Sequence, residues 1–274
     1  MTQWIVGNED IESSFIRLKK CGYDGIEFAA EPYTLDQDRL KMFMRKYAIC
    51  CTSLCGIFSE SRDLTASVGD GGEVAVDYLK SSVDFAVKVG ASLIIVVPSP
   101  VGRIEPVANR SYDTAWNNAI TNIKNVADYA QGKGIMLAIE AINRYETYFV
   151  NTLTKALRLV QEINHPAVSI MADLFHMSIE ENNLSASLRM IAKYLIHVHI
   201  ADNTREAAGL GSTNFKEVLY TLRDIGYKGA LTMEFMPRIA NPYALTDMTT
   251  HSKVMDDYAE QSINYMKQME KSIL

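Results

Sequence analysis

The chain has 274 residues, 48% of them hydrophobic and 22% charged, and its formal net charge is −6. This composition is ordinary for a globular protein with a sizeable core, whereas a nucleic-acid-binding surface is normally basic. No apolar run reaches membrane-spanning length, and the first ten residues lack the basic and apolar regions of a signal peptide. We therefore expect a protein that binds neither nucleic acid nor membranes.

The four cysteines indicate a reducing compartment. Cys50 and Cys51 are adjacent, which is not typical of a disulfide framework. The spacing from Cys51 to Cys55 is loose for a zinc site, and no matching Cys or His pair follows. We expect free thiols packed in a strand, and a cytoplasmic location.

Short apolar runs typical of strands alternate with longer segments of helical periodicity along the whole chain. The predicted strands, in chain order, are residues 3–6, 25–29, 49–57, 92–97, 135–141, 168–173, 195–201 and 230–235. The predicted helices are residues 12–23, 39–48, 76–90, 115–134, 153–164, 184–194, 215–226 and 254–273.

Strand–helix units that alternate in this way favour a (β/α)8 barrel, which is an α/β fold. The alternative is a doubly wound open sheet, but no glycine-rich phosphate loop follows an early strand. No linker rich in Pro, Gly or Ser divides the chain, so we expect a single domain over residues 1–274.

Ionisable side chains stand at the ends of the last four predicted strands, where a (β/α)8 barrel has its active site. They are Glu140, Asp173, His199 and Glu234, which are 33, 26 and 35 residues apart. Each interval is about one strand–helix unit, so consecutive strands would bring the four groups to one place. Because strand side chains alternate between faces, all four fall on the barrel-interior face, while the opposite face is apolar.

Three carboxylates close together would shift one another's pKa values, and a divalent cation removes that conflict. Carboxylate oxygens with one imidazole nitrogen form a hard site, so we expect Mn²⁺ ahead of Mg²⁺ or Co²⁺, whereas zinc normally takes more His or Cys. A strand-end acid taken alone is more often a rim charge or half of an ion pair, but four groups in register favour the metal site. We expect His197 deeper in the barrel, as a hydrogen-bonded residue and not a ligand.

The segments LAIEAINRYETYFVNT (137–152), MADLFHMSIEENN (171–183) and HVHIADNTREAAGLG (197–211) resemble the ketose 3-epimerases, the D-tagatose and D-psicose 3-epimerase group of the xylose-isomerase-like TIM-barrel superfamily. The resemblance covers essentially the whole chain. It implies an isomerase that epimerises a free ketose at C3, removing and returning a proton through a cis-enediolate. It also implies a divalent metal ion and a homo-oligomer, either a dimer or a tetramer.

The same resemblance implies roles for seven residues. The metal ligands would be Glu140, Asp173, His199 and Glu234; Glu140 and Glu234 would also exchange the proton on opposite faces of the sugar carbon; and Glu146, His176 and Arg205 would bind the O1 and O2 end of the substrate. Each of the last three has a plainer interpretation, as an ion-pair partner, a support for a turn and a surface cation. Inverting a carbon beside a carbonyl requires two acid–base groups on opposite faces, so the residue types suit this reaction independently.

The sequence departs from the family pattern at residues 212–214, beside the expected site, so the identity of the sugar stays open. Glu27, Cys55 and Gly56, which end the second and third predicted strands, are further candidates for contacts with the distal end of the sugar, and Trp4 is the candidate that the first strand would contribute.

Other functions share this architecture. An aldose–ketose isomerase or an inosose dehydratase would use the same metal site. A multi-zinc endonuclease of the same barrel would need many His and a cationic surface, whereas the chain has five His and a net charge of −6. A non-enzymatic barrel would be expected to have lost a ligand or one of the acid–base pair.

Overall fold

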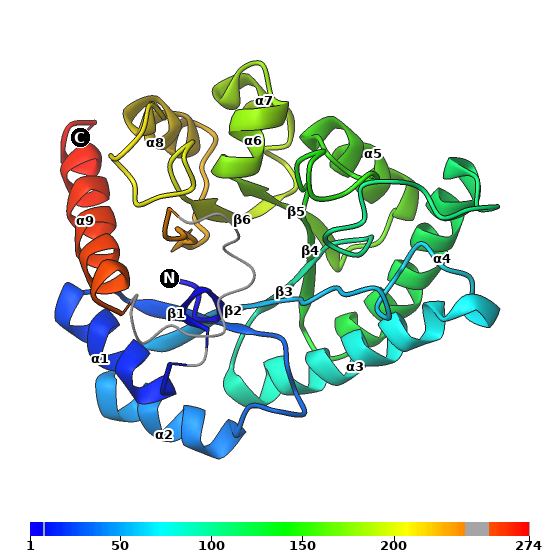
Figure 1. Cartoon of the computed structure of the whole chain (residues 1–274), viewed down its shortest axis with the longest axis horizontal. Helices are drawn as coiled ribbons and strands as arrows, with labels where there is room; N and C mark the ends of the chain where they lie inside the picture. The colour runs from blue at the N-terminus through cyan, green and yellow to red at the C-terminus, as the bar shows by residue number, and fades with distance from the viewer. Residues whose placement is uncertain (8, 239–251, 274) are drawn as a thin grey trace.

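The computed structural model describes residues 1–7, 9–238 and 252–273. Parallel strands form one sheet in which each strand pairs with the next along the chain, and helices surround the sheet (Figure 1). The strands are β1 (Gly25–Ala29), β2 (Cys50–Cys55), β3 (Leu93–Val96), β4 (Met136–Ile139), β5 (Val168–Asp173), β6 (Leu195–Ile200) and β7 (Leu231–Met233). The predicted α/β barrel is therefore confirmed.

Residues 1–3 occupy the place of an eighth strand between β7 and β1. Thr2 N donates a hydrogen bond to Met233 O (3.0 Å), and Gln3 N donates to Glu27 O (2.7 Å). Glu27 N in turn donates to Met1 O (3.0 Å). These bonds join the two edges of the sheet, which is how a barrel avoids unpaired edges.

The predicted strand over residues 3–6 was wrong. Trp4–Val6 form a 3-10 helix, in which Val6 N bonds to Gln3 O at 3.1 Å. Ile5 and Val6 are buried in the core. A short apolar run does not distinguish a strand from a buried helical turn, which explains the error.

Helices connect consecutive strands and surround the barrel. They are α1 (Ile11–Cys21), α2 (Gln37–Tyr47), α3 (Gly72–Val89), α4 (Tyr112–Gln131), α5 (Leu153–Ile163), α6 (Leu174–Glu180), α7 (Leu184–Met190), α8 (Phe215–Asp224) and α9 (Ser252–Lys271). Helix α6 was not predicted. It begins directly after β5 because the Asp173 carboxylate accepts hydrogen bonds from Phe175 N and His176 N and so caps the helix.

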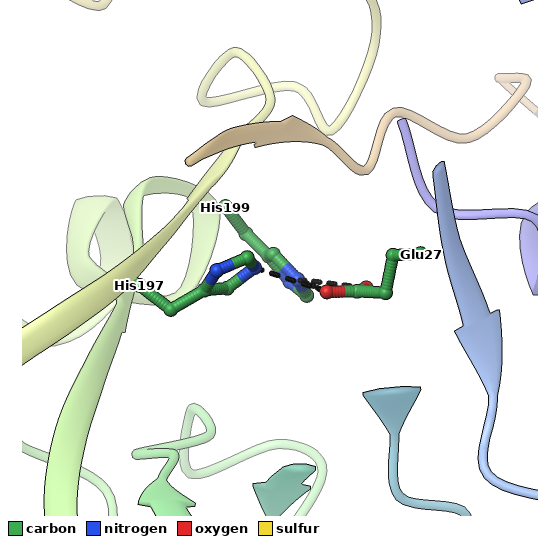
Figure 2. Close-up of side chains that lie close together, drawn as sticks. All are labelled: Glu27, His197 and His199. Carbon is green, nitrogen blue, oxygen red and sulfur yellow. Dashed lines mark hydrogen bonds and ion pairs between the residues drawn. The ribbon is translucent and has the colours of Figure 1, made fainter. Parts of the chain in front are cut away.

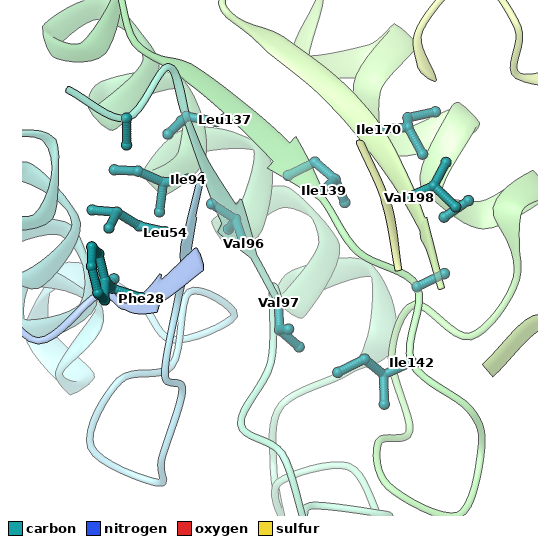
Figure 3. Close-up of a cluster of buried hydrophobic side chains, with 14 of the residues drawn as sticks. Phe28, Leu54, Ile94, Val96, Val97, Leu137, Ile139, Ile142, Ile170 and Val198 are labelled. Carbon is teal, nitrogen blue, oxygen red and sulfur yellow. The ribbon is translucent and has the colours of Figure 1, made fainter. Parts of the chain in front are cut away.

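Apolar side chains of the strands pack in two separate layers. The larger cluster lies between the strands and the helices and includes Ile94, Leu137, Ile139, Ile170 and Val198 (Figure 3). A small cluster fills the barrel interior and consists of Cys55, Leu93, Ile95, Ala138 and Met171. The alternation predicted for the strands that carry the acids is thus largely confirmed.

Ile196 is the exception to this alternation. It packs against the interior cluster and not under the helices. The pairing of β5 with β6 shifts register between Ile170 and Met171, which leaves Ile196 as an extra residue on β6. A β-bulge of this kind breaks the strict two-residue period.

Candidate functional site

The four strand-end residues predicted from the sequence meet at one point. Glu140 directly follows β4, Asp173 ends β5, His199 lies in β6 and Glu234 directly follows β7. Each offers a ligand atom, and these atoms all lie within 4.8 Å of one another. All four side chains are buried.

The backbone fixes the two glutamates although they lie just beyond their strands. Glu140 N donates to Val96 O (3.0 Å), and Glu234 N donates to Ile200 O (2.9 Å). These bonds continue the ladder of the parallel sheet by one residue at each place. The carboxylates are therefore held by the barrel and not by mobile loop backbone.

Polar atoms inside this group match a cation site. His199 Nδ1 lies 3.2 Å from Glu234 Oε2 and 3.7 Å from Asp173 Oδ2. Nδ1 of His199 and Oδ2 of Asp173 are buried and make no hydrogen bond. Buried polar atoms normally have partners, and a divalent cation would supply one to both. Three carboxylates and one imidazole nitrogen suit a hard divalent ion.

The acids perturb one another strongly. Burial, followed by the charge of Glu234, raises the pKa of Glu140 well above its usual range. Burial raises the pKa of Glu234 to about 7. Burial acts in the same direction on Asp173, but the neighbouring His176 and His199 outweigh it and hold the pKa of Asp173 below its usual range. The carboxyl groups of the cluster therefore differ in how readily they hold a proton.

A cavity of about 260 Å³ opens beside Glu140 and Glu234. Its polar lining residues are Glu146, His176 and Arg205 in addition to the two acids. The other lining residues are Trp4, Cys55, Gly56, Ile57, Phe58, Val97, Val101 and Ile142. The volume and the mixed lining suit a small polar molecule with an apolar face.

A second cavity, of about 350 Å³, lies at the other end of the barrel. Its lining includes Gly25 and Leu231, the first residues of β1 and β7, and none of the four strand-end residues. The second cavity is therefore not part of the candidate site, which adjoins the cavity at the carboxyl ends of the strands.

Arg205 is buried and its guanidinium is held on three sides. It donates to Glu146 Oε1 (3.1 Å), lies 3.7 Å from Glu234 Oε2 and stacks on the ring of Phe175 at 4.6 Å. Its backbone has a φ of 63°, a left-handed conformation that is uncommon for a residue with a side chain. Arg205 is therefore not the surface cation of the plainer interpretation.

The loop that carries Arg205 is organised by a buried carboxylate. Asp202 accepts hydrogen bonds from four backbone amides, those of Asn203, Gly209, Gly211 and Thr213. The departure from the family pattern at residues 212–214 falls inside this loop. Through these bonds, Asp202 links the segment that departs from the family pattern to the start of the loop that carries Arg205.

His176 is positioned by a residue that the sequence analysis did not identify. Asn143 Nδ2 lies 2.8 Å from His176 Nδ1 and donates to Glu146 Oε1 at 2.9 Å. Because the amide NH₂ is a donor, His176 Nδ1 accepts and Nε2 carries the proton of the neutral ring. Burial lowers the pKa of His176, which favours that neutral form. Asn143 follows Glu140 by three residues, and that proximity was the available signal.

Trp4, Cys55 and Gly56 line the cavity, whereas Glu27 does not, so the cavity does not support the contact with the sugar that was predicted for Glu27. Glu27 is fully buried and faces His197 and His199 (Figure 2). His199 Nε2 donates to Glu27 Oε1 at 3.0 Å, and His197 Nε2 lies 3.0 Å from Glu27 Oε2 without hydrogen-bond alignment. Burial works against a charge on Glu27, but the two histidines hold its pKa well below the usual range.

Within the described part of the chain, no helix is long and apolar enough to cross a membrane.

Known proteins resemble this chain over most of its length. A family model described as xylose isomerase-like TIM barrel matches residues 15–269. An L-ribulose 3-epimerase from Methylomonas sp. (strain DH-1) is 29% identical over 261 residues, which cover 91% of this chain and 88% of that protein. A 3-dehydro-D-guloside 4-epimerase from Escherichia coli (strain K12) is 28% identical over 246 residues, covering 85% of this chain and 90% of that protein. The crystal structure of D-allulose 3-epimerase from Methylomonas sp. in complex with D-allulose superposes with a TM-score of 0.84 at 26% identity, over 97% of this chain and 94% of that chain.

Proposed function

Because the chain belongs to the xylose isomerase-like TIM barrel family and is an isomerase-class enzyme like its relatives, we propose that it is a metal-dependent epimerase acting at C3 of a free ketose. The observation that carries the proposal is the placement of two carboxylates, Glu140 and Glu234, in one cation-type site beside a cavity of sugar size. A reaction that inverts a carbon must exchange a proton between two faces, and two such groups are available here.

The proposed ligands of the cation are Glu140, Asp173, His199 and Glu234, and Mn²⁺ is expected ahead of Mg²⁺ or Co²⁺. When bound, the cation would polarise the carbonyl and the adjacent hydroxyl of the sugar and so make the C3 proton more acidic. Proton transfer and substrate binding are proposed to depend on side chains of the protein itself.

Glu140 and Glu234 are proposed to act as base and acid on opposite faces of the substrate carbon. One carboxylate removes the C3 proton to give the cis-enediolate, and the other carboxyl group returns a proton to the other face. Burial raises the pKa of both groups, which makes each carboxylate a stronger proton acceptor than an exposed glutamate.

Glu146, His176 and Arg205 are proposed to hold the O1 and O2 end of the ketose. Arg205 supplies N–H donors, and the Nε2–H expected for neutral His176 supplies another. Glu146 bonds both Arg205 and Asn143 and so keeps the donors in place. Fixed donors next to a reacting carbon lower the barrier by positioning the substrate.

Deuterium exchange tests the reaction. The protein is loaded with Mn²⁺ and incubated in D₂O with D-fructose, D-psicose, D-tagatose and ribulose, and proton NMR follows the label. We expect deuterium to enter at C3 with the native protein. We expect this exchange to be abolished in Glu140→Gln and in Glu234→Gln. The matched control is Glu181→Gln, which changes a glutamate in the helical layer that accepts bonds from Leu153 N and Ser187 Oγ.

The alternatives give different results. Label at C1 or C2 would indicate the aldose–ketose isomerase, and loss of water from an inosose would indicate the dehydratase. An absence of exchange with any ketose, with Mn²⁺ bound, would refute the free-ketose proposal. Inosose substrates would then be tested, together with 3-keto glycosides, since the E. coli relative is named as an epimerase of such a compound.

We also propose that residues 1–274 form a single domain that works in the cytoplasm as a homodimer or homotetramer. The family match over residues 15–269 supports one domain, and the four free cysteines suit a reducing compartment. Light scattering coupled to gel filtration would measure the oligomeric state.

A further inference from the structure

A buried hydrogen-bonded group lies beneath the proposed cation site. Glu27 accepts a hydrogen bond from Ser53 Oγ (2.5 Å) and another from His199 Nε2 (3.0 Å). His197 approaches the same carboxylate, and its ring meets that of His199 edge to face, with centroids 5.2 Å apart (Figure 2). Glu27, His197 and His199 are each at most 1% exposed.

The two nitrogens of His199 have separate surroundings. Nε2 faces Glu27, whose carboxylate accepts its proton in a hydrogen bond. Nδ1 faces Asp173 and Glu234 and has no hydrogen-bond partner. An imidazole that donates through Nε2 keeps a lone pair on Nδ1 when it is neutral, and that lone pair is what a metal ligand needs.

Two irregularities of the sheet place this group. The pairing of β1 with β2 skips Thr52, so that Glu27 stands opposite Ser53. The pairing of β5 with β6 skips Ile196, so that Met171 stands opposite His197. Bulges near active sites commonly redirect a side chain, and here both bring a member of the group onto the interior face.

The backbone of Glu27 is also held on its far side. Glu27 N donates to Met1 O, and Glu27 O accepts from Gln3 N, so residues 1–3 bracket it within the closed barrel. A carboxylate buried in this way is costly unless it is fully bonded, and its partners here are all fixed by strands.

We propose that Glu27 is a positioning residue of the metal centre, which holds His199 in the orientation and tautomer that present Nδ1 to the cation. This inference rests on the proposed function, because it takes Asp173, His199 and Glu234 as part of a cation site. Ser53 donates a hydrogen bond to the same carboxylate, and His197 packs against it. Glu27 does not line the cavity, and its carboxylate lies within 4.8 Å of a Glu234 oxygen but is not one of the four proposed ligands.

A second metal ion held by Glu27, His197 and His199 is the competing interpretation, since their atoms are also close together. His199 would then bind two ions through its two nitrogens, which requires removal of both ring protons. Moreover, Glu27 already accepts two hydrogen bonds. Hydrogen bonds to Glu27 therefore explain the arrangement better than a second metal ion does.

The test measures metal binding and the histidine proton, and not activity alone. Calorimetry with Mn²⁺ is expected to give one ion per chain for the native protein and an affinity about 10- to 100-fold lower for Glu27→Gln. Glu181→Gln, with the same chemical change in the helical layer, should bind Mn²⁺ like the native protein. Thermal unfolding of the metal-free proteins identifies any variant that has lost its fold.

The second measurement needs no variant. In the Mg²⁺-loaded native protein with ¹⁵N-labelled histidine, we expect the His199 ring to carry its proton on Nε2, with a downfield shift caused by the bond to Glu27. A proton on Nδ1, two ions per chain, or an unchanged Mn²⁺ affinity in folded Glu27→Gln would each overturn the proposal. If the native protein bound no divalent ion, the proposed function itself would fail, and the two failures are thus distinguishable.

Discussion

Replacing Glu234 by Gln is expected to stabilise the metal-free protein above neutral pH, although it removes a proposed ligand. Burial raises the pKa of Glu234 to about 7 from an ordinary value of 4.5, so the folded state binds this proton more tightly than the unfolded state. Stability then falls as the pH rises above 4.5, where the unfolded carboxyl group ionises, and the loss is complete above about 7.

The size of the effect follows from the same two values. The interval between 4.5 and about 7 corresponds to about 3 kcal/mol of unfolding free energy, which Gln recovers because it is never charged. The attraction of Glu234 to His199 and Arg205 is already included in that pKa, since both lower it. The stabilisation expected for Glu234→Gln is therefore a net value, which already includes the loss of these two attractions.

Urea unfolding of chelator-treated proteins at pH 5 and pH 8 measures the difference. We expect Glu234→Gln and the native protein to differ by about 2.5 kcal/mol more at pH 8 than at pH 5, because a small part of the loss has already occurred at pH 5. Glu181→Gln controls for the chemical change itself. An equal difference at both pH values, or a loss of stability at pH 8 alone, would refute the argument that burial of this carboxylate costs stability.

Three further results are expected. Mn²⁺ should raise the melting temperature more at pH 8 than at pH 5, because the ion needs Glu140 and Glu234 ionised, and calorimetry in two buffers should detect the released protons. Arg205→Lys should raise KM about tenfold or more in steady-state kinetics, since Lys cannot reproduce the planar contacts with Glu146 and Phe175; an unchanged KM would place Arg205 outside substrate binding. Asp202→Ala should lower the unfolding free energy by about 2–4 kcal/mol in urea, because four backbone amides lose their acceptor, and a change below about 0.5 kcal/mol would contradict that role.

The predictable part of the site follows from the geometry of parallel strands. Glu140, Asp173, His199 and Glu234 recur at intervals of one strand–helix unit, and the carboxyl ends of neighbouring strands meet at one edge. The spacing along the sequence was therefore enough to predict that these four distant residues meet. The apolar face of each strand supplied the second constraint, because a shift by one residue would have buried the acids under the helices.

The part that was missed depends on local departures from regular structure. Glu27 was assigned to the sugar because it was taken to stand at the end of a predicted strand, but it lies in the middle of β1 and is buried below the cavity. The skipped residues Thr52 and Ile196 have no sequence signature, and they decide which side chains meet below the site. Asp173 was predicted as a ligand, yet its second function as the cap of α6 required knowing where the helix begins.

The closure of the barrel by residues 1–3 sets an order of assembly during synthesis. These residues can pair with β1 as soon as both have left the ribosome, but their other partner, Met233, is made only after β1 to β6 and the helices between them. Until then the nascent sheet keeps an open edge that can recruit other chains. His199 and Glu234 also emerge late, so a nascent chain has no complete ligand set until its last strand is in place. If the proposed cation binds, it would therefore stabilise only chains in which β7 has joined the sheet, and metal supply during folding would then affect the yield of folded protein.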